Sequence, residues 1–260
     1  YSLTLETNPA GVSIPSGAGW YDANTYAPIS TAQTVDIVTG ASRYNFTGWA
    51  TGDMSEIVNP GSPSTTVLMD RGKTVTANYA TQYLVAFAQT GVGSDYAGTV
   101  VTVDGTGYSR AVLPASFWWN KDSSHGFAFG STLTVGASKQ YLWNSTSGLS
   151  TLQSGLIIAS GSGSVSGNYN TQYNVTVTAS PSAALGATFK VTYTQLGITY
   201  AGVTRTTQWT DWADEGTTVT VSEPEPYRPS EAGQAGVRYR FDSYTPSASV
   251  TMTEGRTIAL

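Results

Sequence analysis

The sequence predicts an all-β protein made of three small domains in tandem, and three observations support this prediction. A short phrase recurs along the chain, alternating apolar and polar residues fill the segments between its copies, and no long segment shows an apolar stripe of helical period. The phrase is Asn-Tyr-x-Thr-Gln-Tyr, found at residues 78–83 and again at residues 168–173. The opening residues, 1–5, resemble the segment that follows each copy.

The repeat has the length of a domain. Taking Tyr1, Tyr83 and Tyr173 as equivalent gives periods of 82 and 90 residues, whereas solenoid repeats usually run about 20–50 residues. A unit of this size can bury a modest core of its own. The phrase contains no Gly or Pro, which predicts extended and fairly stiff junctions. We therefore expect three domains as beads on a string, at residues 1–80, 81–170 and 171–260.

Each copy is expected to open on a strand, to carry an aromatic cluster near its first third, and to close on a turn followed by an alternating strand. Val, Thr and Tyr dominate the alternating stretches and suit a half-buried pleated surface. These stretches include residues 84–87, 99–103, 174–177, 189–193 and 217–221. The closing turns and strands are expected near residues 70–76, 161–166 and 254–258. Helix is expected only as a short insertion.

The tryptophans allow two interpretations, a buried core or an exposed sugar-stacking surface. Trp20, Trp118 and Trp209 recur once in each copy, which favours equivalent and largely buried positions. Side chains alternate between the two faces of a strand, so one residue of the pair Trp118-Trp119 must point outward. We expect Trp119 and Trp212 to be exposed aromatics that contact another domain or subunit.

Composition excludes several classes of function. Charged residues make up 11% of the chain, against roughly a quarter in an average soluble domain. The net charge of −5 leaves no basic patch, which argues against binding to nucleic acid. There is no cysteine, so a disulfide framework and a thiolate metal site are both excluded. No apolar run approaches the ~18–20 residues of a membrane span, so none is expected in this chain.

Residues that carry chemistry are few, and their spacing indicates no active site. The lone histidine, His125, follows the double Trp in a polar segment read as a turn, and one His without Cys cannot build a zinc site. No Gly-x-Ser-x-Gly elbow supports a Ser/His/Asp triad. The acidic cluster Asp211, Asp214 and Glu215 lacks the spacing of an EF-hand calcium loop. We expect no catalytic residue, no metal and no cofactor, and hence no enzyme.

A set of motifs in the first copy carries a family resemblance. Phe46-Thr47-Gly48-Trp49 is followed by Gly52-Asp53, by Asn59-Pro60 and by a Lys-Thr-Val-Thr-Ala-Asn-Tyr run at residues 73–79. Together these resemble the divergent internalin-B-type repeat of bacterial and archaeal cell-surface proteins. The match covers residues 1–80, and the other copies depart from it, since the second lacks the Gly-Trp pair.

The resemblance implies a small β-rich module, an immunoglobulin-like sandwich or a β-grasp-like fold, in long extracellular proteins with stalk, adhesion or lattice roles. It implies no catalytic residues. We therefore expect an extracellular structural protein, a subunit or segment of a prokaryotic and specifically archaeal cell-surface filament, stalk or S-layer-type lattice. Two alternatives stay open: a glycan-binding adhesin module, and the accessory repeat region of a secreted hydrolase. The expected partners are further copies of the chain, joined head to tail, and surface glycans.

Two sets of candidate sites follow from this expectation. Sequons of the Asn-x-Ser/Thr form make Asn144 and Asn45 glycosylation candidates at equivalent places, whereas Asn174 is expected inside a strand. The chain starts where a junction would deliver it and stops before the phrase would recur. Either the chain is a piece of a longer polypeptide, or successive subunits meet head to tail. In the second case we expect an open edge strand at one terminus that a neighbouring subunit completes, as a donor strand does. The assembly candidates are the residues of the two terminal strands: Tyr1, Ser2, Leu3, Thr4, Leu5, Ile258 and Leu260.

Overall fold

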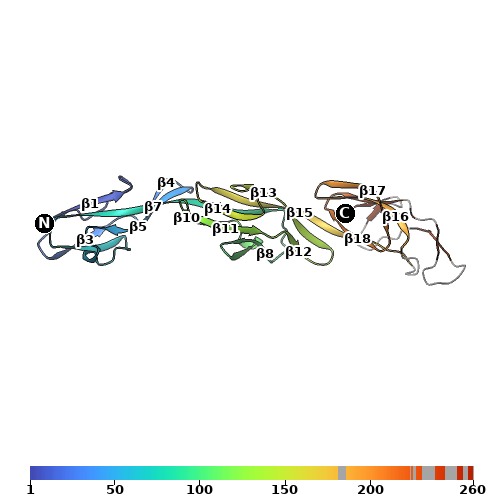
Figure 1. Ribbon diagram of the computed structural model, residues 1–260, viewed down its shortest axis with the longest axis horizontal. Helices are drawn as coiled ribbons and strands as arrows, with labels where there is room; N and C mark the ends of the chain where they lie inside the picture. Colours follow the sequence, from blue (N-terminus) through green and yellow to red (C-terminus); the bar gives the residue numbers. More distant parts are fainter. Residues whose placement is uncertain are drawn as a thin grey trace.

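The computed structural model is an elongated rod in which three β-modules follow one another (Figure 1). It describes residues 1–180, 186–222, 224, 227–229, 238–243, 251–253 and 257–259. The all-β prediction is confirmed, since the described residues form strands, two short 3-10 turns and no α-helix. Three separate hydrophobic clusters lie along the rod, within residues 3–79, 83–169 and 175–221. We call each cluster, with the strands that supply it, the first, second and third module.

The first module packs two layers of strands face to face. The larger layer has the order β2-β1-β7-β5-β4 and belongs to a ten-stranded sheet, whereas the smaller layer pairs β3 with β6. The 3-10 turn η1 (Met54–Glu56) lies between β5 and β6. The strands are β1 (Ser2–Asn8), β2 (Gly19–Trp20), β3 (Thr25–Ser30), β4 (Thr34–Val38), β5 (Ser42–Ala50), β6 (Ser64–Met69) and the first half of β7, which as a whole spans Lys73–Thr90.

The second module repeats this plan and adds a hairpin. Its larger layer has the order β10-β7-β15-β13-β12, and its smaller layer has the order β14-β11-β8-β9. The hairpin β8–β9 has no counterpart among the strands of the first module. Besides the second half of β7, the elements are β8 (Thr99–Val103), β9 (Thr106–Ser109), η2 (Arg110–Val112), β10 (Ala115–Asn120), β11 (Ser124–Phe129), β12 (Thr132–Thr134), β13 (Lys139–Gly148), β14 (Ser154–Ile158) and the first half of β15, which as a whole spans Gly163–Val177.

The third module begins with the second half of β15, which pairs with β18 as β7 pairs with β10. A second sheet has the order β17-β16-β19-β23-β22, and β20 pairs with β21. The closing turn expected at residues 254–256 and the assembly candidate Leu260 lie outside the described residues. The bounds are β16 (Thr188–Gln195), β17 (Ile198–Thr206), β18 (Trp209–Asp214), β19 (Thr218–Ser222), β20 (Tyr227–Pro229), β21 (Arg238–Arg240), β22 (Thr251–Thr253) and β23 (Thr257–Ala259).

The strand register shows that the first two modules are built alike. In each, the opening strand runs parallel to the closing strand, with Leu3 opposite Lys73 and Val85 opposite Gly163. Leu3 and Val85 each lie two residues after a tyrosine of the repeat, so the structure aligns Tyr1 with Tyr83. The sequence alone does not predict this parallel pairing, because the paired strands are about 70–80 residues apart.

A buried ion pair fixes the start of β7. Lys73, which is 4% exposed, lies 2.7 Å from the Glu56 carboxylate and 2.8 Å from that of Asp70. Arg71 closes the cluster with a contact of 2.6 Å to Glu56. The hydrogen bond from Lys73 lowers the pKa of Asp70. Mutual pairing is what allows Lys73 and Glu56 to be buried, since an isolated charge in a core is costly.

The structure corrects the alignment of the tryptophans. Trp20, Trp118 and Trp212 each pair with the residue that follows the repeat tyrosine, which is Ser2, Leu84 or Asn174 respectively. Trp212 is therefore the counterpart of Trp20 and Trp118, and Trp209 is not. The sequence-based alignment placed the third copy three residues too early.

Burial corrects two further expectations. Trp20 is 83% exposed, although it was expected in the core, and Trp119 is 5% exposed, although it was expected to point outward. The alternation of faces along β10 is as expected, but its phase is opposite: Trp118 lies on the outer face and Trp119 on the inner one. Trp209 is buried, as expected, and Trp212 is half-buried.

We expect Trp49→Ala and Trp20→Ala to differ sharply in stability. Trp49 is fully buried, lies 5.6 Å from the Phe46 ring and donates a hydrogen bond to the Ser62 carbonyl. Its truncation should lower the free energy of unfolding of the first module by about 3–5 kcal/mol. Truncation of Trp20 should change it by less than about 0.5 kcal/mol. Urea unfolding of both variants provides the check, and equal losses would contradict the burial described here.

Candidate functional site: the two module junctions

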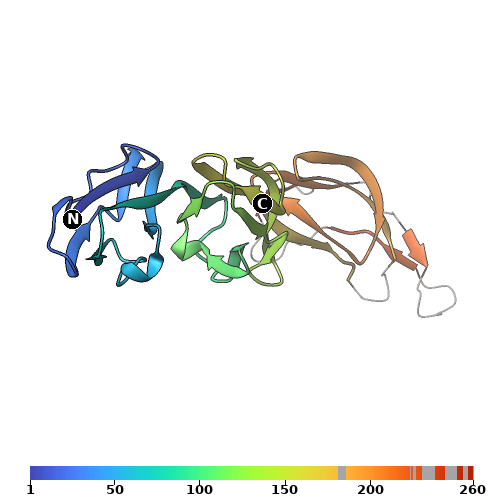
Figure 2. The same cartoon turned by 60° about the vertical axis from the view of Figure 1, so that its left-hand side comes forward.

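Each junction is a single strand that serves two modules. β7 and β15 pass from one core to the next without a break, which confirms the expected extended junctions (Figures 1 and 2). The last core residue before the junction and the first after it are six positions apart in both strands: Tyr79 to Val85, and Tyr169 to Val175. An even spacing keeps both side chains on the same face of the strand. Each strand therefore contributes to two cores with no change of face.

A glutamine on β7 connects the first two modules. The Arg43 side chain, on β5 of the first module, donates through Nε to Oε1 of Gln82 at 2.9 Å. Gln82 in turn donates through Nε2 to Oδ1 of Asn120, on β10 of the second module, also at 2.9 Å. This hydrogen-bonded chain crosses three adjacent strands. We call such a chain a glutamine relay.

The same relay occurs at the second junction. Gln140 on β13 donates to Oε1 of Gln172 at 2.9 Å, and Gln172 donates to Oδ1 of Asp214 on β18 at 2.9 Å. The register confirms that the two relays are equivalent, because Gln140 and Asp214 both lie opposite Gln172 as Arg43 and Asn120 lie opposite Gln82. Gln172 is 0% exposed, and both its partners are buried.

Sequence reasoning recorded the two relay glutamines as part of the repeated phrase without assigning them a role. Both copies of the phrase contain Thr-Gln-Tyr, and a strand that enters a core does not require a glutamine there. The recurrence of this glutamine is the feature of the sequence that could have indicated its role at the junctions. The partners of Gln82 and Gln172 come from strands about 30–40 residues away in sequence. They are Arg43 and Asn120 at the first junction but Gln140 and Asp214 at the second, so no partner is of the same residue type in both.

Cationic side chains also lie against aromatic rings at both junctions. The Arg43 guanidinium is 4.2 Å from the ring centre of Trp118, which places a first-module residue over a second-module ring. At the second junction, the Lys139 ammonium is 5.0 Å from the Tyr141 ring and 5.9 Å from the Tyr173 ring. Such cation–π contacts are worth about 0.5–1 kcal/mol at exposed sites and more when water is excluded.

The charged groups near the second junction are held in specific contacts. Hydrogen bonds from Lys139, at 2.8 Å, and from Tyr141 lower the pKa of Asp95. The same contact with Asp95 raises the pKa of Lys139. Burial, together with a hydrogen bond of 3.0 Å to Glu215, raises the pKa of Tyr173. Asp95 and Lys139 are therefore each stabilised in the ionised form, whereas Tyr173 is stabilised in the neutral form.

The acidic cluster of the third module has structural roles. Asp214 belongs to the second relay and also accepts from the Gly197 amide at 2.8 Å. Asp211 accepts from the Tyr193 hydroxyl at 2.7 Å, and Glu215 accepts from Tyr173. Across the part of the chain that the structure describes, no group of three or more His, Cys, Asp or Glu side chains is arranged to hold a metal ion.

His125 lies in a hydrogen-bonded array with a serine and an aspartate, at the start of β11 rather than in the expected turn. Its Nδ1 is 2.7 Å from Asp104 Oδ2, and its Nε2 is 2.8 Å from Ser123 Oγ. A Ser/His/Asp triad shows the same pattern. The Ser123 hydroxyl, however, donates its one proton to the Asn120 carbonyl at 2.6 Å, so toward His125 Nε2 it can only accept.

Packing favours a structural role for this array. The His125 ring stacks flat on the buried Trp119 ring, with centres 3.9 Å apart and an interplanar angle of 3°. Asp104 also accepts from the Gly126 amide at 2.9 Å, which ties the β8–β9 turn to β11. The array thus covers one end of the second core, next to the first junction.

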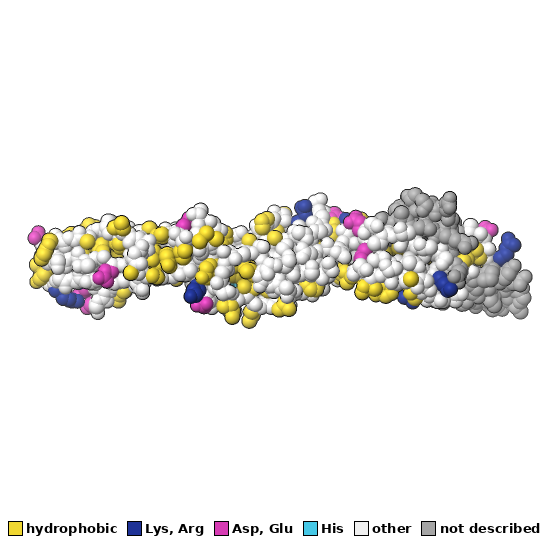
Figure 3. Space-filling model, turned by 90° about the horizontal axis from the view of Figure 1, so that it is seen from above, with side chains coloured by type: hydrophobic (Ala, Val, Ile, Leu, Met, Phe, Trp, Pro, Cys, Tyr) yellow, Lys and Arg dark blue, Asp and Glu magenta, His cyan; other side chains and the backbone are white. Residues whose placement is uncertain are grey.

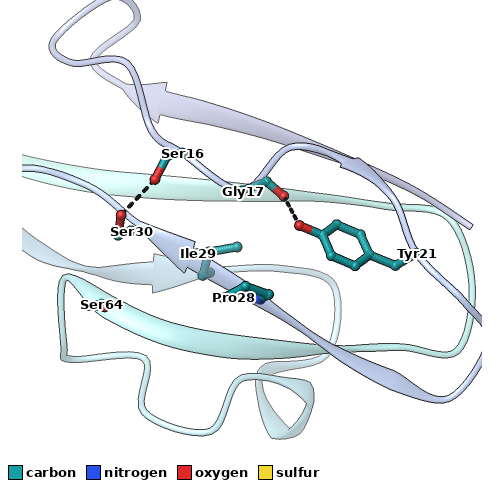
Figure 4. A pocket seen from close by; sticks show the side chains of 7 residues that line it. All are labelled: Ser16, Gly17, Tyr21, Pro28, Ile29, Ser30 and Ser64. Atoms are coloured by element: carbon teal, nitrogen blue, oxygen red, sulfur yellow. Dashed lines mark hydrogen bonds between the residues drawn. The ribbon is translucent and has the colours of Figure 1, made fainter.

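Among the shallow depressions of the described surface, one lies in the first module and another at the second junction. The first, of about 280 Å³, lies in the first module (Figure 4). Three of its hydroxyl groups are hydrogen-bonded: the Ser16 and Ser30 hydroxyl oxygens are 2.7 Å apart, and Tyr21 donates to the Gly17 carbonyl at 2.8 Å. The second, of about 460 Å³, is lined by second-junction residues including Tyr169, Asp214 and Glu215.

The glycosylation candidates occupy different environments. Asn144 is exposed at a β-bulge of β13, between Trp143 and Ser145. Asn45 is half-buried in β5, between β4 and β7, and is not the counterpart of Asn144. The matching bulge in β5 contains Thr47 instead. Asn174 lies within β15, as expected, and is half-buried opposite Trp212.

The assembly candidates lie in strands that are already paired. Residues 1–5 largely form β1, which pairs with β7 on one edge and, through Ser2 and Leu3, with β2 on the other. Leu3 is buried in the first core. Both edges of β1 are thus occupied at Ser2 and Leu3, and completion of an open edge strand by a neighbouring subunit stays a prediction. Ile258 lies in β23, opposite Val219 of β19 and Met252 of β22.

Comparisons with known proteins leave the family open. No protein family model matches the chain, and no curated protein sequence matches it. Among solved structures, a streptococcal ancillary pilin is similar over 85% of this chain and 72% of that chain, with 12% sequence identity and a TM-score of 0.21. Two folds with so low a TM-score do not correspond as wholes, so the function is argued from this chain's own residues. Within the described ranges, no helix is long and apolar enough to cross a membrane.

We expect Gln172→Ala to be more damaging than Gln82→Ala. Removing Gln172 takes one hydrogen bond from each of the buried Gln140 and Asp214 side chains, which should cost about 1–3 kcal/mol, although Asp214 keeps its bond from the Gly197 amide. The partners of Gln82 reach solvent, where water replaces the lost hydrogen bonds, so the cost there should be smaller. Urea unfolding of the two variants tests this matched pair. A neutral Gln172→Ala would show that the second relay does not stabilise the junction.

We also expect Ser123 to be unreactive toward a fluorophosphonate probe, because its hydroxyl donates to the Asn120 carbonyl. Mass spectrometry of the intact chain after incubation should show no adduct, with a serine hydrolase as the positive control. An adduct that disappears in Ser123→Ala and in His125→Ala would show instead that the array activates its serine.

Proposed function

We propose that this chain is an extracellular structural protein, a stiff segment of a prokaryotic cell-surface filament, stalk or lattice. The observation that carries this proposal is the sharing of β7 and β15 between successive cores. A protein that must hold two sites apart needs length and resistance to bending more than it needs a pocket. Both properties follow from strands that do not end at the module boundaries.

The mechanical argument rests on what bending would break. At the first junction, β7 is paired with β5 up to Tyr83 and with β10 from Gln82 onward, so no residue of the junction lacks a paired neighbour. Bending there would break backbone hydrogen bonds and the relay together. A flexible linker, by contrast, resists bending only through its entropy. A pulling force along the rod would pass through one continuous backbone.

The surface supports an extracellular setting. Only 11% of the residues are charged, and hydroxyl and amide side chains take many solvent-facing positions. The exposed bulge at Asn144 offers an acceptor for sugar on a protruding backbone. Because the titratable groups described above serve in structural contacts, we infer no catalytic role for this chain.

Immunogold electron microscopy tests the proposed function. Antibodies raised against the purified chain should label threads or a regular layer outside the envelope of the cells that produce it. Antibody first absorbed with the purified chain provides the control and should leave the cells unlabelled. Label confined to the cell interior would contradict an extracellular structural role.

A further inference from the structure

We propose that β14, an edge strand of the second module, pairs antiparallel with β14 of a second copy of this chain. Leu156, at the centre of the strand, lies opposite its own counterpart across a two-fold axis. The pairing joins two rods side by side at their middle modules. The inference rests on the proposed function, because it supplies a lateral contact between rods of a filament or lattice.

One edge of β14 is open. The strand is the outermost of the order β14-β11-β8-β9, and among the described strands it pairs with β11 alone. It lies in the middle of the rod, away from both ends (Figure 1). An edge of this kind is a template on which another strand can pair.

The backbone of β14 directs hydrogen-bonding groups to this open side. Leu156 lies opposite Gly126 of β11, whose amide donates to Asp104 Oδ1 and whose carbonyl accepts from the Asp104 amide, both at 2.9 Å. The Gly126 groups therefore point away from β14, which makes this a non-hydrogen-bonded pair of the ladder. In such a pair the amide and carbonyl of Leu156 point away from β11 as well. Because the orientation repeats at alternate residues, those of Ser154 and Ile158 also face the open side.

The side chains beside this edge are apolar and exposed. Leu156 is 75% exposed and Ile158 is 62% exposed, whereas Ile157 between them is buried in the second core. The residue opposite Leu156 on β11 is Gly126, so that position offers no side chain to cover it. Exposed aliphatic side chains along an unpaired strand are typical of an interaction surface.

β14 lacks the features that keep edge strands apart, which are charged side chains, proline and β-bulges. No Asp, Glu, Lys, Arg or His occurs between Lys139 and Lys190, and the register with β11 is continuous. The opposite edge of the same layer, β9, is different. Its register with β8 shifts between Thr99 and Val101, as at a β-bulge, and Arg110 follows it directly. The face of the rod seen in Figure 3 also carries few charged side chains.

The strand is complementary to itself, which identifies the partner as a second copy. With Leu156 on the axis, all five residues of β14 pair, so that Ser154 lies opposite Ile158 and Gly155 opposite Ile157. Leu156 and Ile158 of both copies then form one apolar cluster, since diagonal neighbours on a sheet are within reach of each other. Two chains of net charge −5 repel each other, and a charge-free segment is where this repulsion is smallest.

A single contact of this kind is expected to be weak. Five residues from each copy bury far less than the roughly 800 Å² per partner of a standard interface. Pairing should therefore depend on a high local concentration, as in a layer of rods on a surface.

Cysteine cross-linking of the intact chain tests the register, since the chain contains no cysteine of its own. A mixture of Ser154→Cys and Ile158→Cys should form disulfides between chains, because the Cα atoms of a hydrogen-bonded pair are about 5.5 Å apart. Either variant alone should cross-link at least about tenfold more slowly. Two copies of the same residue are then offset by four positions, or about 13 Å along the strands.

Sedimentation velocity over a range of concentrations tests the association itself. The wild-type chain should form dimers as concentration rises, and Leu156→Lys should weaken dimerisation by about tenfold or more, because it places like charges directly opposite each other. Val112→Lys, at a 57% exposed residue beyond the opposite edge strand, is the matched control and should dimerise normally. Equal melting temperatures would show that both variants are folded.

Three results would overturn the proposal. They are a chain that stays monomeric up to its solubility limit, unchanged dimerisation in Leu156→Lys, and cross-linking that is no faster in the mixture than in either cysteine variant alone. Each of these leaves immunogold labelling, and with it the proposed structural role, untouched.

Discussion

The whole architecture depends on one constraint, that a single strand must serve two hydrophobic cores. β7 supplies Val75, Ala77 and Tyr79 to the first core and then Val85 and Phe87 to the second. Because these residues lie on one face of a continuous strand, the orientation of the second module is fixed by the twist of the strand. The second junction repeats the arrangement with the same spacing, so the direction of the rod is set twice by the same geometry.

The glutamine relays add a second constraint to the first. Between the last residue of one core and the first of the next, the shared strand supplies no fully buried apolar side chain. There a glutamine amide, which both donates and accepts, connects the shared strand to the strands on its two sides. Gln172 is buried with both of its amide atoms paired, so displacement of either neighbouring strand would leave a polar group without a partner. The relays therefore link the position of each module to that of its neighbour.

The sequence predicted the all-β class, the repeat and the extended junctions, because these depend on local alternation and on a recurring phrase. It did not predict which face each aromatic occupies, since the phase of a strand is set by partners distant in sequence. Trp118 and Trp119 were assigned to the wrong faces for that reason. Trp209 was aligned with Trp20 because it is the first tryptophan of the aromatic cluster in its copy, and only the strand register shows that Trp212, three residues later, is the counterpart. The relay partners differ at each junction, and only the strand register shows their equivalence.

Distance measurement across a junction tests the central claim most directly. The chain contains no cysteine, so Ile37→Cys and Leu156→Cys allow nitroxide labels to be placed specifically at one exposed residue of the first module and one of the second. Double electron–electron resonance on this doubly labelled chain should give a single narrow distance distribution, as expected when one strand belongs to both cores. A broad or multi-peaked distribution would show that the modules move independently, and would contradict the account of a stiff rod.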